Sequence, residues 1–193
     1  TSKSNLLMDE YYDKIAGGYD ELHMVEQLKK MTAIIADIGA DIPKKNEKLL
    51  DVGCGSGIST SVWNCECTGI DPSAELIALA QKKHPGVKFV VGNAEKLPFE
   101  DKSFDIVICI TAMHNFSDLR QGIDEMKRVC KGRFVLSVLR KSPQAEEIQK
   151  LIILNFKVKK IVMEEKDLIF ICTPRLWKKQ IGSPQQTSDS PST

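Results

Sequence analysis

The chain has 193 residues, 27% of them charged, and a formal net charge of +1. This length predicts one domain with a buried core that needs no disulfide or metal to hold it together. The composition, 42% hydrophobic, excludes a disordered chain, and the near-neutral charge argues against a protein that is polybasic as a whole.

The six cysteines predict a reducing environment. They lie mostly in apolar stretches, and they include no C-x-x-C pair, so we expect neither a disulfide framework nor a four-cysteine zinc site. Cys65 and Cys67 have no neighbouring histidine, and we expect no metal. Because no run of 18 apolar residues and no signal-peptide core occurs, we expect a cytoplasmic protein that does not cross a membrane.

Helix and strand patterns alternate along the chain. Residues 21–40 place apolar side chains three and four positions apart, which predicts an amphipathic helix that ends at Gly39. Short apolar runs after it predict strands, and the segments between them predict helices. The expected strands are 48–53, 67–71, 87–94, 104–110, 133–139, 156–164 and 167–174, and the expected helices are 58–64, 72–84, 119–130 and 142–155.

The order of these elements predicts an α/β fold. Helices between successive apolar strands indicate a parallel sheet covered on both faces. Only Glu165 and Lys166 separate the last two strands, so they are expected to form an antiparallel hairpin. We expect a single domain over residues 1–179, with residues 1–45 as an N-terminal helical lid. Residues 180–193, rich in Gln, Ser, Thr and Pro, predict a disordered tail.

The strongest local motif is D-V-G-C-G-S-G, residues 51–57, directly after the first strand. A strand that ends in glycines ahead of a helix presents bare backbone N–H groups to a ligand. Three glycines in five residues exceed what a tight turn needs, so the motif predicts a ligand site. The spacing G-x-G-x-G also differs from the G-x-G-x-x-G of dinucleotide sites.

Two carboxylates narrow the choice of ligand. Asp51 lies two residues before the first glycine, where it is badly placed for a phosphate but suits a cation. Asp71 ends the next strand, 18 residues after Gly53, and suits the two hydroxyls of a ribose. A ligand with a ribose, no phosphate and a cationic amino-acid end is S-adenosylmethionine.

At this point the sequence resembles the class I S-adenosylmethionine-dependent methyltransferases. LLDVGCGSG looks like their first motif, GIDPS like the second, and VVGNAEKLPFEDKSFDIVIC like the third and fourth. YYDKIAGGYDEL and the LPF-x-x-x-SFD segment are most similar to the ubiquinone/menaquinone-type branch. The resemblance implies a Rossmann-like three-layer sandwich with a seven-stranded, mostly parallel sheet of order 3-2-1-4-5-7-6, in which strand 7 is antiparallel.

The resemblance also implies roles for residues at the edge of the sheet. Asp51 would bind the methionine ammonium through water, and Asp71 would accept both ribose hydroxyls. Asn93 stands where many relatives have Asp, but its side-chain oxygen can still accept from the adenine amino group. The cofactor-binding residues implied are Tyr11, Tyr19, Asp51, Gly53, Cys54, Gly55, Gly57, Asp71, Pro72, Asn93, Ala94, Glu95, Ile110 and Thr111.

His114 is the candidate catalytic residue. It follows the fourth strand, in a stretch expected to line the methyl-transfer channel, and imidazole is a base near neutral pH. Methyl transfer needs a base only when the acceptor must lose a proton early. Contact with the acceptor and a purely structural role are the alternative interpretations of His114.

The sequence does not identify the methyl acceptor, and it is compatible with three hypotheses. The first is an enzyme that methylates a small molecule and releases S-adenosylhomocysteine. The second is an RNA or protein methyltransferase that works with a small zinc-ribbon activator. The third is a non-catalytic cofactor-binding protein, although no expected cofactor residue has been lost. No N-P-P-Y-type tetrapeptide follows the fourth strand, which argues against amino-nitrogen methylation of DNA, RNA or glutamine.

The net charge of +1 hides an asymmetry. Residues 1–126 hold 13 Lys and Arg against 20 Asp and Glu, whereas residues 127–193 hold 14 against 6. In the fold that the resemblance implies, this basic part lies beside the acceptor pocket. A solvated basic edge and an anionic acceptor or partner are both compatible with it.

Overall fold

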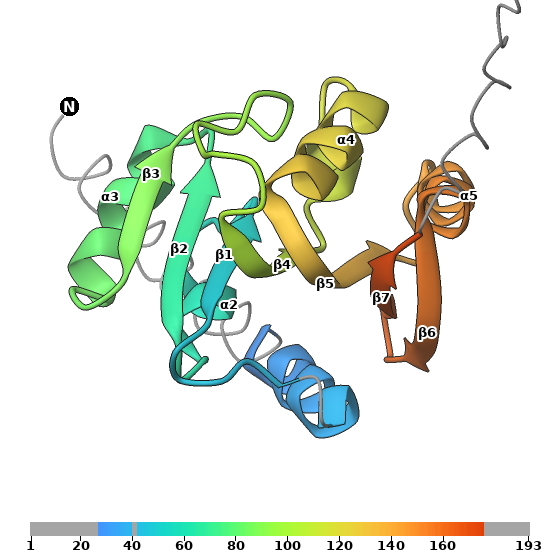
Figure 1. The fold of residues 1–193 in the computed structure, drawn as a ribbon, viewed down its shortest axis with the longest axis horizontal. Coiled ribbons are helices and arrows are strands. Elements are labelled where there is room, and N and C mark those ends of the chain that lie inside the picture. The colour runs from blue at the N-terminus through green and yellow to red at the C-terminus, as the bar shows by residue number, and fades with distance from the viewer. Residues whose placement is uncertain (1–26, 40–41, 176–193) are drawn as a thin grey trace, which may run out of the picture.

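The computed structural model describes residues 27–39 and 42–175 (Figure 1). Seven strands form one sheet in the order β3-β2-β1-β4-β5-β7-β6, which confirms the predicted order. The strands are β1 (Lys48–Val52), β2 (Glu66–Asp71), β3 (Lys88–Val91), β4 (Phe104–Ile110), β5 (Cys130–Leu139), β6 (Phe156–Met163) and β7 (Asp167–Pro174).

The first five strands run in one direction, and β7 runs against its neighbours. β1 pairs in parallel with β2 and β4, and β4 pairs in parallel with β5. β7 is antiparallel to both β5 and β6, so the predicted terminal hairpin is present. Because parallel strands all end at the same edge of a sheet, Val52, Asp71, Ile110 and Leu139 mark one common edge, called here the carboxyl edge.

Helices cover both faces of the sheet. The helical residues 27–38 form the described part of the N-terminal helix. The other helices are α2 (Ile58–Ser61), α3 (Ala74–Lys83), α4 (Leu119–Val129), α5 (Ala145–Asn155) and the 3₁₀ turn η2 (Met113–Asn115). Figure 1 shows the N-terminal helix, in blue, on one side of the sheet and α4 and α5 on the other.

The two faces follow from the period of two along each strand. Ile106, Ile108 and Ile110 of β4 pack in one apolar cluster with the N-terminal helix. Val107 and Cys109, which alternate with them, pack in a second cluster with α4 and α5. Both sets are at least nine-tenths buried, so continuous apolar strands are what a sheet covered on two faces requires.

Several predicted boundaries differ from the observed ones. β3 ends at Val91, although the pattern predicted a strand to residue 94, and the last bond between β2 and β3 is from the Gly92 N–H to the carbonyl of Asp71, at 3.0 Å. α2 stops at Ser61, short of the predicted 64. β5 begins three residues earlier than predicted, and α5 begins at Ala145.

Some of the basic residues near the C-terminus lie away from the carboxyl edge, whereas Arg140 and Lys141 directly follow Leu139 at it. Lys131, Lys157 and Arg175 line an open cavity of about 760 Å³ at the amino ends of β5 and β6. This edge is opposite the carboxyl edge because β7 is antiparallel and brings its last residues back there. Most of the predicted lid and the predicted tail, residues 180–193, lie outside the described residues. Within the described part of the chain, no helix is long and apolar enough to span a membrane.

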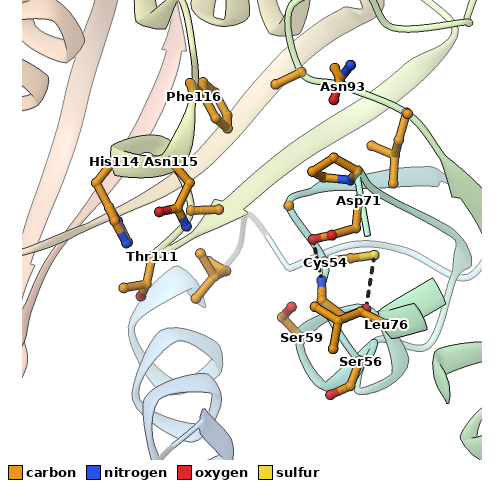
Figure 2. Close-up of a pocket in the computed structure, with 18 of the residues that line it drawn as sticks. Cys54, Ser56, Ser59, Asp71, Leu76, Asn93, Thr111, His114, Asn115 and Phe116 are labelled. Carbon is orange, nitrogen blue, oxygen red and sulfur yellow. Dashed lines mark hydrogen bonds between the residues drawn. The ribbon is translucent and has the colours of Figure 1, made fainter. Parts of the chain in front are cut away.

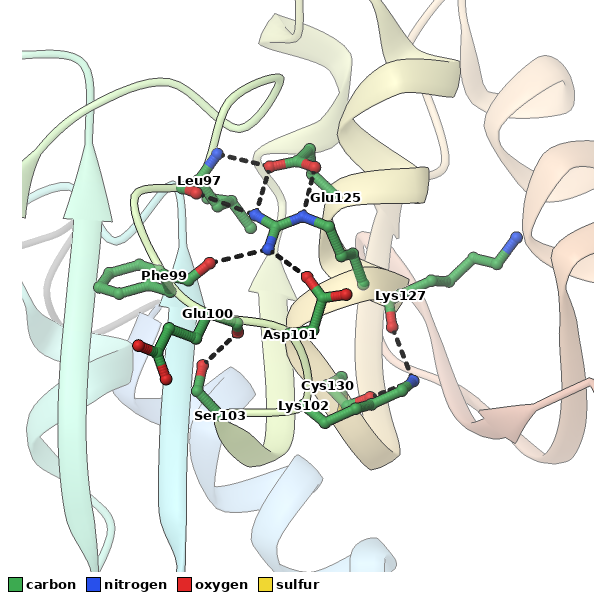
Figure 3. A network of polar contacts seen from close by, with 10 residues as sticks. Leu97, Phe99, Glu100, Asp101, Lys102, Ser103, Glu125, Lys127 and Cys130 are labelled. Carbon is green, nitrogen blue, oxygen red and sulfur yellow. Dashed lines mark hydrogen bonds and ion pairs between the residues drawn. The ribbon is translucent and has the colours of Figure 1, made fainter.

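An arginine clamp holds the loop between β3 and β4 against α4 (Figure 3). The Arg128 guanidinium donates to both carboxylate oxygens of Glu125, to Asp101, and to the carbonyls of Leu97 and Phe99, at 2.7–2.9 Å. Its hydrogen bonds lower the pKa of the Glu125 carboxyl below its ordinary value. All of these donors match the fixed fork of a guanidinium, so the clamp depends on arginine specifically.

We therefore expect Arg128→Lys to lower the free energy of unfolding by about 2 kcal/mol, because a lysine leaves several acceptors of the loop unpaired. The matched control is Arg120→Lys on the exposed side of the same helix, which should change stability by less than about 0.5 kcal/mol. Urea denaturation of the two variants and the parent chain measures both values. Equal stabilities would show that the clamp contributes nothing.

Candidate functional site

The glycine-rich turn after β1 has a backbone that only glycine adopts at no cost. Gly53, Gly55 and Gly57 have φ angles of 77°, 53° and 83°, all in the left-handed region. The N–H groups of Gly53 and Cys54 both donate to the carbonyl of Ile70, at 2.8 and 3.1 Å. The turn is thereby tied to the end of β2, and the predicted strand-turn-helix is present.

The three glycines differ in how closely other segments pack against them. A Cβ on Gly53 would lie 2.3 Å from the Cβ of Ala112, and a Cβ on Gly57 would lie 2.6 Å from the ring of Phe89. Both glycines therefore allow neighbouring segments to pack. A Cβ on Gly55 would meet nothing within 4 Å, so this glycine borders open space inside the site.

Asp71 anchors the wall of the site at the end of β2 (Figure 2). Its Oδ2 accepts from the Gly55 N–H and its Oδ1 accepts from the Ser73 N–H, both at 2.9 Å. Each carboxylate oxygen has a further lone pair after these bonds. The predicted ribose ligand is therefore compatible with Asp71, which also fixes the glycine turn relative to the start of α3.

Asp51 lies beneath the turn and is fully buried. Ser59 and Thr60 donate their hydroxyls to its Oδ2, at 2.6 and 2.7 Å. Its Oδ1 is buried without a hydrogen-bond partner. Burial raises the pKa of Asp51 to about 6, against the lowering effect of the two hydroxyls. An unpartnered buried oxygen is costly, and it fits a carboxylate that completes its contacts with a cationic ligand.

A cavity of about 820 Å³ opens at the carboxyl edge. In Figure 2, Cys54, Asp71 and Asn93 lie on one side of it, and His114 and Phe116 lie on the other. The residues that line it and that the sequence predicted are Gly53, Cys54, Gly55, Asp71, Pro72, Asn93, Ala94, Glu95, Ile110, Thr111 and His114. Residues from four separate turns thus meet at one site.

Some predicted residues do not line this cavity. Asp51 and Gly57 lie behind its wall, while Tyr11 and Tyr19 fall outside the described residues. Glu95 lines it, but its Oε1 accepts from the N–H and hydroxyl of Ser117 and from the N–H of Asp118, at 2.7–3.1 Å. This oxygen therefore joins two loops of the site.

Other residues line the cavity that the sequence analysis did not single out. Ser56 and Ser59 belong to the glycine turn and the helix that follows it, and Leu76 lies in the first turn of α3. Leu139 ends β5, and Gln27 begins the described part of the N-terminal helix. Its position as the last residue of a predicted strand was the available signal for Leu139, whereas nothing in the local pattern indicates Gln27.

Metal ligands are not grouped in this part of the chain. Within residues 27–39 and 42–175, no cluster of three or more His, Cys, Asp or Glu side chains is arranged to hold a metal ion. The thiols of Cys65 and Cys67 lie 3.5 Å apart at the start of β2, and the carboxyl-edge cavity does not include them.

The chain matches a family model described as a methyltransferase domain over residues 50–136. It is 32% identical over 166 residues to a demethylmenaquinone methyltransferase of Chlorobaculum tepidum, a match that covers 81% of this chain and 69% of the relative. The matched segment of the family model contains the glycine turn, Asp71 and His114.

Solved structures with this fold include the PH0226 protein of Pyrococcus horikoshii, with a TM-score of 0.63 and 22% identity over 78% of this chain and 92% of that one. A chain in the complex between the Haloferax volcanii Trm112 methyltransferase activator and a methyltransferase matches with a TM-score of 0.62 and 17% identity. That match covers 79% of this chain and 93% of the other. At these identities the structures establish the shared fold.

The raised pKa of Asp51 predicts pH-dependent ligand affinity. An ammonium group is attracted only by the ionised carboxylate, so binding of S-adenosylhomocysteine should weaken as pH falls through about 6. For a single linked proton, the affinity at pH 5 should be about tenfold lower than at pH 7. Calorimetry across this range measures it.

Asp51→Asn is the control, because it removes the carboxylate whose pKa is raised. Its affinity should be low and nearly constant from pH 5 to 7. Ionisation of the Asp51 carboxylate also lowers the free energy of unfolding as pH rises through about 6, since its pKa is higher in the folded chain than in the unfolded one. A wild-type affinity that does not change with pH would contradict the role given to Asp51.

Proposed function

Because the chain belongs to the class I S-adenosylmethionine-dependent methyltransferases, in the branch that includes the demethylmenaquinone methyltransferases, we propose that it methylates a small molecule. The observation that carries the proposal is the composition of the cavity wall. Among the described residues that line it, none is Lys or Arg, and the only ionisable residue types are Asp71, Glu95, His114 and Cys54. A polyanion such as RNA needs cations where its backbone enters a site.

The cofactor side of the cavity is the glycine turn with its two carboxylates. When bound, S-adenosylmethionine supplies the methyl group of its sulfonium, and any correctly placed nucleophile can accept this methyl group. The open space at Gly55 admits its amino-acid end and ribose, and the free lone pairs of Asp71 accept the ribose hydroxyls. The unpartnered Oδ1 of Asp51 attracts the ammonium through water. These contacts orient the donor in a fixed direction.

The acceptor side is formed by η2, the end of β5 and the N-terminal helix. His114 and Asn115 lie opposite the glycine turn (Figure 2), and Leu139 and Gln27 add to the same wall. In our proposal, these residues hold the acceptor in line with the sulfonium and exclude water. For an acceptor that must lose a proton, His114 is the base within the described wall of the cavity.

A second candidate is a macromolecular methyltransferase that works with an activator. The likeness of fold to a chain from the Trm112 complex favours it, as do the cations around the cavity at the opposite edge. Co-purification from cells tests this candidate: a small zinc-ribbon protein or RNA that remains bound to the chain would support it. A clean monomer that methylates a small molecule would exclude it.

Binding of S-adenosylhomocysteine tests the cofactor assignment, and activity on a small acceptor tests the substrate class. We expect a calorimetric heat with S-adenosylhomocysteine and methyl transfer to a reduced demethylmenaquinone used as the probe. The absence of any heat would refute the cofactor assignment. Transfer to RNA but to no small molecule would refute the substrate class alone.

We expect His114→Ala to lower methyl transfer at least tenfold while the affinity for S-adenosylhomocysteine changes by less than about twofold, since the imidazole is on the acceptor side. His114→Gln is the matched variant, because glutamine keeps volume and hydrogen bonding but accepts no proton. If Gln restores the rate, His114 only contacts the acceptor. If affinity falls as much as rate in the Ala variant, His114 supports the cofactor instead.

A further inference from the structure

A buried polar cluster lies behind the acceptor side of the cavity and joins four elements. Lys30 of the N-terminal helix is 2% exposed and Asp167, the first residue of β7, is 0% exposed. The Lys30 Nζ and the Asp167 Oδ2 form an ion pair at 2.6 Å. Ser137 of β5, also buried, and Thr111, directly after β4, complete the cluster. Sequence analysis assigned Lys30, Ser137 and Asp167 no role.

Thr111 is the centre of this cluster. Its N–H donates to the Ser137 Oγ at 2.8 Å, and its Oγ1 accepts from the Lys30 Nζ at 2.7 Å. The same Oγ1 lies 3.0 Å from the Ser137 Oγ and donates to the Asp167 Oδ1 at 3.0 Å. The N–H and the hydroxyl of Thr111 are thus both held by partners from the other three elements.

The backbone of Thr111 needs such partners. Its φ of 55° lies in the left-handed region, which is unfavourable for a β-branched residue. Strained residues of this kind persist when the surrounding structure holds them, and they gather at functional sites. The hydrogen bonds from Ser137, Lys30 and Asp167 supply that restraint here.

The strained turn places both walls of the site. Ala112, the next residue, is brought against the glycine turn, where its Cβ lies 2.3 Å from the position of a Cβ on Gly53. η2 then follows with His114 and Asn115 on the acceptor side. Gln27, three residues before Lys30 on the N-terminal helix, lines the same cavity. One cluster therefore fixes the helix and the turn after β4 together.

We propose that Lys30, Ser137 and Asp167 are positioning residues of the methyltransferase site: they hold Thr111 in its left-handed conformation and fix the N-terminal helix beside the acceptor. The proposal rests on the proposed function for its site. A buried ion pair often adds little net stability, because desolvation opposes the attraction of the charges. The Lys30–Asp167 ion pair lies between a strained turn and a helix that lines the cavity. Its location therefore indicates that it contributes to the geometry of the site rather than to the stability of the fold.

Ser137→Ala tests the restraint on Thr111 with the smallest deletion. It removes the acceptor of the Thr111 N–H, so the affinity for S-adenosylhomocysteine should fall about tenfold. Cys172→Ala is the matched control: it also deletes one buried side-chain heavy atom, from β7, and should change this affinity by less than about twofold. Melting temperatures of both variants show the cost to stability.

A background variant without backbone strain at residue 111 distinguishes a positioning role of Ser137 from a role in packing alone. Thr111→Gly adopts a φ of 55° without cost, so Ser137→Ala should change the affinity by less than about twofold in that background. A tenfold loss in both backgrounds, or an unchanged affinity in Ser137→Ala alone, would overturn the proposal. A parent chain that does not bind S-adenosylhomocysteine would refute the proposed function itself, and the two failures are thus distinguishable.

The ion pair is tested through the helix that it holds. The double variant Lys30→Met, Asp167→Asn leaves no unpaired buried charge, so it should fold. We expect amide hydrogen exchange of residues 27–39 and 111–115 to become at least about tenfold faster, with little change elsewhere. Unchanged exchange in the helix would overturn its part in positioning, and equal acceleration across the whole chain would show a general loss of stability instead.

Discussion

The close contact between Gly53 and Ala112 is the constraint on which the site depends. β1 and β4 are parallel neighbours, with Asp51 opposite Ile108, so the turns that follow them emerge side by side at the carboxyl edge. They can meet only if one of them has no side chain at the point of contact. Gly53 satisfies this condition, and the left-handed Thr111 turns Ala112 towards it. The remaining walls of the cavity are arranged around this junction.

The two carboxylates of the site act under different physical conditions. Asp51 is fully buried, and one of its oxygens has no hydrogen-bond partner. Its ionisation is therefore unfavourable, and its pKa is raised to about 6. Asp71 accepts two backbone N–H bonds, which fix the glycine turn and the start of α3. Asp51 therefore has a hydrogen-bonding position left to fill, whereas Asp71 already has a structural task in the turn.

Local patterns were sufficient for the α/β class, the parallel sheet and the terminal hairpin, because continuous apolar strands and intervening helices admit few arrangements, while the order of the strands came from the resemblance to the family. They also placed the glycine turn, Asp71 and His114 at one edge, since the ends of parallel strands converge. Local patterns failed where a partner distant in the sequence determines whether a residue is buried or where a strand ends. Lys30 occupies a polar position in an amphipathic pattern, yet it is buried because Asp167 and Thr111 meet it. The end of β3 was misplaced because its partner β2 ends at Asp71, opposite Val91, and offers no strand beyond that point.

The cavity at the carboxyl edge lies far from three cations of the basic C-terminal part, whereas Arg140 and Lys141 directly follow Leu139 at that edge. Lys131, Lys157 and Arg175 lie at the amino ends of the strands, whereas the cavity opens at the carboxyl ends, the length of β5 away. Screening in physiological salt acts over about 8 Å, and a strand of ten residues is about 33 Å long. These cations cannot attract an acceptor into the cavity directly. They can only hold something large enough to reach both edges, and in our proposal a small acceptor is selected by the cavity wall around His114 and by the helix that Lys30 fixes.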